Sequence, residues 1–289
     1  MIPADEATGL FGPASVSWRI DRELVVLAGG SCALLMQVAH PIVAAGVVDH
    51  STYAIDPFGR LLRTLESSFD VVFGSRSVAE ATIRRLNAIH ASVRGTMPDR
   101  ASTYSALDPE ALLWVHATLI DTALRTYSRF VAPLSAADEQ TYHLESGRIA
   151  LMLGVPEGLL PPTIGELRHW MGERMSDGTI RVTPEARRIA ATVLYPLPWV
   201  PRVAWDAAHL ISLSALPPAL RRQYGIGWTD ARERGVERLA GLISRALPLL
   251  PDALRHAPQA RAAERRVDRV MWANGQAPRR GPLGHPPLS

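Results

Sequence analysis

The stretch 29-GGSCALLMQVAHPIVAAGVVDHSTYAIDPFGRLLRT-64 joins a long apolar segment to the start of an amphipathic helix. His40 interrupts the apolar run, and Arg60, Arg63 and Thr64 then crowd one turn of the helix that follows. An apolar cavity with a few fixed polar groups is what a bound cofactor requires. The stretch therefore predicts a helical protein with a cofactor pocket.

The composition is that of an ordinary globular chain. Its 289 residues are 47% hydrophobic and 20% charged, which allows a sizeable core and argues against disorder. All 31 basic residues are arginine, and they alternate with acidic residues in segments such as 231-ARERGVER-238, as on solvated helix faces. No basic stripe is interleaved with aromatic residues, so no nucleic-acid partner is expected.

The cysteine content and the apolar segments bound the class of protein. Cys32 is the single cysteine, which excludes a disulfide framework, a thiolate metal cluster and the two-cysteine attachment of haem. The N-terminus lacks the basic start and apolar stretch of a signal peptide. The segment Leu24–Val48 is apolar enough to span a membrane, yet Gln37, His40 and Pro41 interrupt it. We therefore expect a buried core helix in a soluble, cytoplasmic protein without a transmembrane segment.

Helix start signals recur through the chain. Capping-box spacing occurs at Ser77 and Thr163, each with a glutamate three residues later, and in a weaker form at Ser135. No convincing strand pair or Asn-Gly hairpin appears. A capping side chain also stands directly before a proline at three places, Asp56-Pro57, Asp108-Pro109 and Thr183-Pro184.

Between these starts the apolar residues recur with helical rather than alternating spacing. The pattern predicts an all-α fold, a single large helical domain over residues 1–276 followed by a flexible Pro- and Gly-rich tail at 277–289. Short proline-rich joints such as 195-YPLPWVP-201 separate the later helices. About ten helices are expected, at residues 21–39, 57–72, 77–94, 108–131, 136–153, 163–174, 184–194, 201–214, 229–247 and 258–274.

Three histidines are candidates for a ligand or a catalytic group. His90 shares an apolar helix face with Ile83, where a neutral imidazole is either a core side chain bonded to a carbonyl or an axial ligand to haem iron. His116 lies on a similar face and is the main competitor. His40 ends the apolar helix, and its ring either bonds at the helix terminus or faces the cavity. For a lone histidine the core role is the more frequent one.

A polar stripe marks the helix expected at 57–72. Arg60, Arg63, Thr64 and Ser67 fall on one side of it. Such a stripe is usually the solvated face of an amphipathic helix. In the functional alternative, the arginines hold a propionate or another anion by forked hydrogen bonds, and Thr64 offers a hydroxyl near bound oxygen or substrate.

Other common chemistries lack their motifs. Glu166 and His169 form one copy of the helical carboxylate–histidine pair, whereas a di-iron bundle needs two. HExxH, GxSxG, Walker and strand-borne GxGxxG motifs are absent, which removes the common hydrolases, NTPases and Rossmann enzymes.

The segments QVAHPIVAAGVVDHS, DPFGRLLRT, VVFGS, IHASVRG and YSALDPEALLWVHATLIDT follow one another in an order that resembles the MpaB-type oxygenase family. The latex clearing protein, a rubber oxygenase, is a distant relative of that family. The resemblance covers about residues 10–270 and is specific over 37–121; PPALRRQYGIGW and PLLPDALR carry it more weakly. It implies an all-α, partly globin-like fold with non-covalently bound haem b.

The resemblance also implies roles for individual residues. His90 matches the proximal iron ligand, and Arg60 and Thr64 match residues beside the haem. Arg63 falls where the rubber oxygenase has a distal lysine, and because this chain has no lysine, polyisoprene is not the expected substrate. His116 would be the alternative cofactor-binding residue.

The function implied is an oxidoreductase that activates O2 or peroxide at a histidine-ligated iron and oxidises a small apolar substrate. Arg63, Thr64 and His40 are the candidates for orienting or protonating the oxygen species. Two other functions stay open: a haem sensor or carrier with His40 as a sixth ligand, and a cofactor-free helical protein that binds a partner or lipid. Exposed apolar helix faces would make a homodimer unsurprising.

Overall fold

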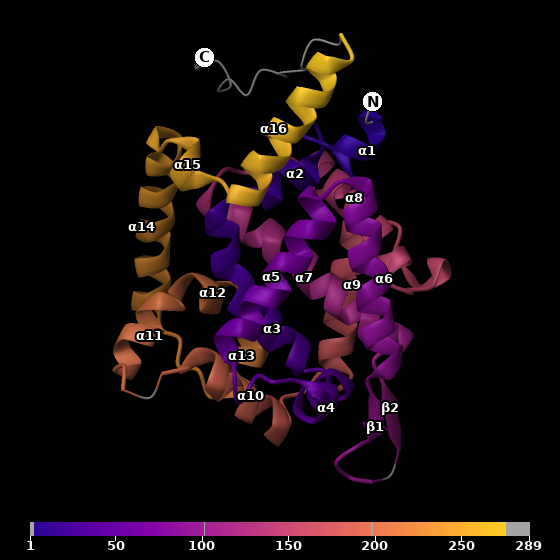
Figure 1. Cartoon of the computed structure of the whole chain (residues 1–289). Helices are drawn as coiled ribbons and strands as arrows, with labels where there is room; N and C mark the ends of the chain where they lie inside the picture. The colour runs from indigo at the N-terminus through magenta and orange to yellow at the C-terminus, as the bar shows by residue number, and fades with distance from the viewer. Residues whose placement is uncertain (1–2, 101, 198, 276–289) are drawn as a thin grey trace.

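The computed structural model describes residues 3–100, 102–197 and 199–275. The chain has the predicted all-α architecture, with one short antiparallel hairpin among the described residues (Figure 1). The tail predicted at 277–289 lies outside them. The α-helices are α1 Ala4–Thr8, α2 Val16–Asp21, α3 Gly30–Val38, α4 Pro41–His50, α5 Pro57–Phe73, α6 Arg76–Ser92, α7 Pro109–Phe130, α8 Ala136–Met152, α9 Ile164–Ser176, α10 Pro184–Leu194, α11 Arg202–Ala208, α12 Leu210–Ala215, α13 Pro218–Tyr224, α14 Asp230–Ala246, α15 Asp252–Arg255 and α16 Pro258–Ala273.

Shorter elements complete the chain. The hairpin pairs β1 Arg94–Thr96 with β2 Thr103–Ser105, and Gly95 lies opposite Tyr104. A side-chain carbon at position 95 would come within 3 Å of the Tyr104 ring, so the close pairing requires glycine there. The 3-10 segments are η1 Leu24–Gly29, η2 Glu157–Leu159 and η3 Leu247–Leu249.

The core is built around α7, which runs through the middle of the molecule with α3, α8, α9 and η1 packed on it (Figure 1). The α7 side chains of Leu113, Trp114 and Leu124 are fully buried. The Trp114 indole N–H donates to the Met36 carbonyl oxygen of α3 at 2.8 Å, so even the polar atom of this large side chain is satisfied. Burial of these side chains supplies the main stabilisation of the fold.

Cys32 lies in this core, between α3 and α7. Its backbone N–H donates to Ser212 Oγ of α12 at 2.7 Å, and the Thr122 hydroxyl of α7 lies 3.8 Å from its sulfur. Burial raises the pKa of the thiol to about 12. Because the thiolate is the reactive form, Cys32 is a packing residue.

The apolar segment is broken where the sequence predicted one helix at 21–39. The 3-10 segment η1 leads into α3, and Pro41 then begins α4, which was not predicted. Proline suits the first position of a helix, where its missing N–H leaves no bond unmade. No described helix alone is long and apolar enough to cross a bilayer; the pair 24–38 and 41–50 passes on length and composition but is bent by 104°.

Most predicted helix starts are confirmed, and one is wrong. Asp56, Asp108, Ser135, Thr163 and Thr183 each accept a backbone N–H at the start of their helix. The Ser77 cap is wrong, because α6 begins one residue earlier than predicted. Its cap is Ser75, whose hydroxyl accepts the N–H of Val78. The segment predicted at 201–214 is two helices, α11 and α12, and the short helices α1, α2, α13 and α15 were not predicted.

The antiparallel pair α5–α6 is held against the rest of the fold by the ends of the chain. Helix α16 packs on α1 and α5 (Figure 1). Trp18 and Phe73 meet edge to face at 5.2 Å, and Ala263 of α16 is buried against them. Buried Glu23 accepts hydrogen bonds from Arg255 at 2.7 to 3.0 Å, with a ring nitrogen of His256 3.4 Å away. These contacts clasp α15 and α16 to η1.

Candidate functional site

The first turn of α5 is fixed by its cap. The Asp56 carboxylate accepts the backbone N–H of Gly59 at 2.8 Å. A side-chain carbon at Gly59 would overlap the Asp56 carboxylate in its present position, so a larger residue there would move the carboxylate. The turn therefore presents the next residues of the helix, from Arg60 onward, in a defined orientation.

The Arg60 guanidinium is half-buried and forms no ion pair with a carboxylate among the described residues. Its Nε donates to the hydroxyl of Ser51, in the segment that joins α4 to α5. No carboxylate lies within ion-pair distance of its guanidinium among the described residues. Burial, and then the charge of Arg63, lower the pKa of Arg60. A buried charge normally has a partner, so this guanidinium is free to take an anion.

Arg63 and Thr64 lie on the exposed side of the same helix. The Arg63 guanidinium bonds Asp56 at 3.2 Å and the Thr52 hydroxyl at 3.1 Å. The Thr64 hydroxyl donates to the Arg60 carbonyl oxygen at 2.9 Å. Ser51 and Thr52, which orient the two arginines, were missed from the sequence; their only signal is a pair of hydroxyl residues just before the Asp56 cap.

His90 lies level with these residues on the neighbouring helix. The Thr82 hydroxyl of α6 lies 3.5 Å from the Asp70 carboxylate of α5. One turn further along α6, Arg85 donates at 3.0 Å to Ser67, which lies one turn earlier in α5. In an antiparallel pair this register continues. It brings His90 to the level of the first two turns of α5, which carry the polar stripe.

The His90 imidazole is half-buried, and one of its nitrogens is unused. Its Nδ1 is buried and has no hydrogen-bond partner among the described residues. Burial lowers the pKa of His90, so the ring is neutral at pH 7. A core histidine would be expected to bond a carbonyl through this nitrogen, and this one does not. A neutral imidazole with a free nitrogen is suited to metal ligation.

The hairpin closes the same end of the molecule. The hairpin follows α6 directly. The hydroxyl of Tyr104 in β2 donates a hydrogen bond to the Asp49 carboxylate of α4. The ring of His50 lies 3.2 Å from the Arg94 carbonyl oxygen of β1. The end of α4, the hairpin, the start of α5 and the end of α6 are thus connected.

His40 lies elsewhere, at the turn between α3 and α4. It borders a narrow crevice with Glu110 and Trp114 of α7 and Trp170 of α9, and the crevice has no room for a water molecule. Burial lowers the pKa of His40, and its Nδ1 has no described partner. No residue of α5 or α6 lines this crevice.

His116 also lies apart from α5 and α6, within the core. Burial, with a smaller contribution from His143 of α8, lowers the pKa of His116 to about 3. Its Nε2 has no hydrogen-bond partner in the described part of the chain. The structure therefore gathers Arg60, Arg63, Thr64 and His90 along one helix pair and separates His40 and His116 from them. In the described ranges no group of three or more His, Cys, Asp or Glu residues is placed to hold a bare metal ion.

Comparison with known proteins places this geometry in a family context. Residues 18–245 match the family described as ER-bound oxygenase mpaB/B'/Rubber oxygenase, catalytic domain. The uncharacterized proteins Rv2237 of Mycobacterium tuberculosis and Mb2261 of Mycobacterium bovis are each 29% identical over 226 residues. These alignments cover 75% of this chain and 87% of each relative. No solved structure matches significantly.

Proposed function

Because the chain belongs to the mpaB and rubber oxygenase catalytic-domain family, we propose that it is a haem b-dependent oxygenase that oxidises an apolar small molecule. Membership of the family identifies the chain as an oxygenase that acts on a small molecule. Haem b as the cofactor and an apolar compound as the substrate are what we propose. One observation carries it. The half-buried Arg60 lacks a carboxylate, and the His90 imidazole at the same level of α5–α6 lacks a partner for its buried nitrogen.

These two residues fit the two chemical ends of haem b. His90, whose pKa is lowered by partial burial so that the ring is neutral, would ligate the iron. Arg60 would pair with a propionate, which would neutralise the guanidinium by forked, charge-assisted hydrogen bonds. Haem b would supply the activation of O2 or peroxide when bound.

Arg63 and Thr64 would act on the reacting molecules. Arg63 is held by Asp56 and Thr52 and would orient a polar group of oxidant or substrate. The Thr64 hydroxyl, which now donates to its own helix, would rotate to donate there. His40, proposed from the sequence to move a proton, would need its narrow crevice to open. His40 and His116 are therefore kept as the alternative iron ligands.

An apolar substrate is supported by the side chains around this helix pair. Ile55 before α5, Leu62 on α5 and Ile89 on α6 are 88%, 59% and 50% exposed. Exposed apolar side chains on and beside the helix pair that carries the proposed site would suit an apolar molecule. Exposed apolar helix faces are also the basis on which a homodimer was expected, and that expectation is kept.

The test is the visible spectrum of protein from haem-supplemented cells, for the wild type and for His90→Ala, His116→Ala and His40→Ala. We expect a Soret band in the wild type that shifts when the reduced protein binds carbon monoxide. His90→Ala should lose at least about 90% of the bound haem, while the other two variants keep most of it. Far-ultraviolet circular dichroism checks that each variant is folded.

Three results would contradict parts of the proposal. A folded wild type without a Soret band would leave a cofactor-free helical protein. Haem that resists carbon monoxide would indicate two protein ligands and a sensor or carrier. Haem lost on His116→Ala but kept on His90→Ala would move the ligand into the core.

A further inference from the structure

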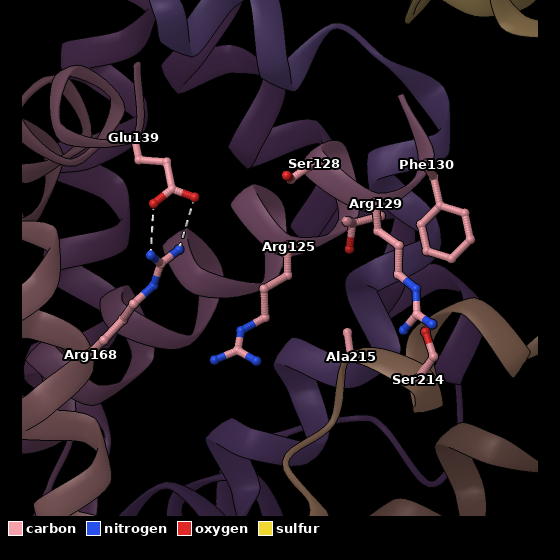
Figure 2. A pocket seen from close by; sticks show the side chains of 9 residues that line it. Arg125, Ser128, Arg129, Phe130, Glu139, Arg168, Ser214 and Ala215 are labelled. Carbon is pink, nitrogen blue, oxygen red and sulfur yellow. Dashed lines mark hydrogen bonds and ion pairs between the residues drawn. The ribbon is translucent and has the colours of Figure 1, made fainter. Parts of the chain in front are cut away.

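A second polar site lies apart from α5 and α6, next to α7. A pocket of about 310 Å³ opens between α7, α8, α9 and α12 (Figure 2). Arg125 and Arg129 of α7, Arg168 of α9 and Glu139 of α8 line it. None of the residues proposed to hold haem or to act beside it lines this pocket.

The arginines of this pocket differ in how far acids satisfy them. Arg168 is saturated: its Nε donates to Asp121 at 3.0 Å, and its two terminal nitrogens donate to Glu139 at 2.7 and 3.3 Å. Arg129 donates one terminal N–H to Glu233 of α14 at 2.5 Å. Arg125 differs from both because neither of its terminal nitrogens donates to an acid among the described residues.

Arg125 uses only one of its three nitrogens. Its Nε donates to Asp121 at 2.6 Å, while Nη1 and Nη2 donate to no residue in the described part of the chain. In Figure 2 the guanidinium extends into the opening between Arg168 and Arg129. The forked end of Arg125 is therefore presented to a ligand.

A fourth guanidinium, that of Arg221, lies close enough to Arg129 and Glu233 to interact with their charges but does not line the pocket. Arg221 of α13 stacks over the Trp228 ring at 4.4 Å and has no carboxylate within ion-pair distance among the described residues. Its Nη1 is buried without a partner. The Trp228 indole N–H donates at 2.7 Å to Glu233, the carboxylate that holds Arg129. Arg221 thus belongs to the same network.

The network carries one positive charge in excess. It contains the four arginines 125, 129, 168 and 221 and the three carboxylates of Asp121, Glu139 and Glu233. The Ser128 hydroxyl at the pocket has no partner within the described ranges, and Phe130 and Ala215 give it an apolar part.

From this arrangement we propose that the pocket binds the oxyanion group of a small organic molecule, a carboxylate or a phosphate monoester. The free fork of Arg125 donates two parallel hydrogen bonds to two oxygens of the anion. The excess positive charge of the surrounding network favours an anion over a neutral ligand, and the pocket volume is at the lower end of the range for small-molecule sites, about 300 Å³.

Calorimetric titration of the full-length protein tests the proposal, with inorganic phosphate and butyrate as separate probes and sodium chloride holding the ionic strength constant. Binding of phosphate, of butyrate or of both supports the site and identifies which oxyanion it accepts. Arg125→Gln should weaken binding at least about tenfold, because a forked, charged pair is lost. Ser128→Ala changes the pocket lining away from the Arg125 guanidinium, leaves every ion pair intact and should bind about as the wild type does.

The matched control is Arg188→Gln. Arg188 also pairs with an acid on its own helix, Glu185 of α10, and is exposed away from the pocket. This variant should bind as the wild type does. Binding of neither probe, or equal binding by wild type and Arg125→Gln, would overturn the proposal. Neither pocket variant should change the Soret band, so this test is independent of the haem test.

Discussion

At the scale of single residues, buried histidines couple the stability of this protein to pH. His116 is neutral in the folded core because burial lowers its pKa from 6.5 to about 3. The unfolded chain exposes the ring to water, where it takes up a proton below about pH 6.5. Between the two pKa values the unfolded state binds more protons, so stability is lost as the pH falls through 6.5 toward 3.

His116→Leu should remove this part of the pH dependence. Between pH 7 and pH 5 the wild type should lose about 2 kcal/mol of unfolding free energy through His116, and the variant should lose that much less. Urea unfolding at both pH values measures the loss within each protein, so a change in baseline stability cancels. His169→Leu is the control, because His169 is exposed on α9 and should leave the loss as in the wild type. Equal losses in wild type and His116→Leu would contradict the argument.

At the scale of elements, local chemistry determined what the sequence could predict. The caps at Asp108 and Thr163 and the proline starts were found because each depends on a few neighbouring residues. The break at Pro41 was taken as an end although it begins α4, because His40 supplies no capping side chain. The hairpin was missed since its strands have three residues each, too few to show alternation.

The contribution of the Glu23–Arg255 ion pair to the docking of α15 and α16 can be tested. Burial favours the protonated form of Glu23, but the nearby His256 ring and the hydrogen bonds from Arg255 outweigh it and lower the pKa of Glu23. Glu23→Ala leaves these donors without an acceptor and should destabilise the fold by about 3 kcal/mol, measured by urea unfolding. The control is Glu173→Ala, whose exposed pair with His169 should be worth less than about 0.5 kcal/mol. A loss of under 1 kcal/mol for Glu23→Ala would show that packing alone docks α15 and α16.

At the scale of the whole molecule, the fold extends past the segment that matches the family. The match ends at residue 245, yet α16, at Pro258–Ala273, packs on α1 and α5. Because α5 carries Arg60, the C-terminal helix supports the helix pair on which the proposed haem site depends.

The candidate site could be predicted only in part from the sequence, because spacing within one helix is visible there and packing between helices is not. Helical spacing placed Arg60, Arg63 and Thr64 on one side of α5, and this follows from one helix alone. That His90 lies level with them, and that His116 lies in the core, depends on how helices pair in space. The arginine pocket joins residues from α7, α8, α9 and α12, so no local pattern revealed it.

The buried thiol of Cys32 makes opening of the core measurable by chemical labelling. It is the chain's one thiol, it is fully buried between α3 and α7, and burial holds its pKa near 12. An alkylating reagent can therefore react only while the contact between these helices is open. The rate of alkylation should rise with urea in step with loss of the core, and it should fall when a ligand stabilises the folded state. Each reacted molecule records one opening of the core without any introduced label.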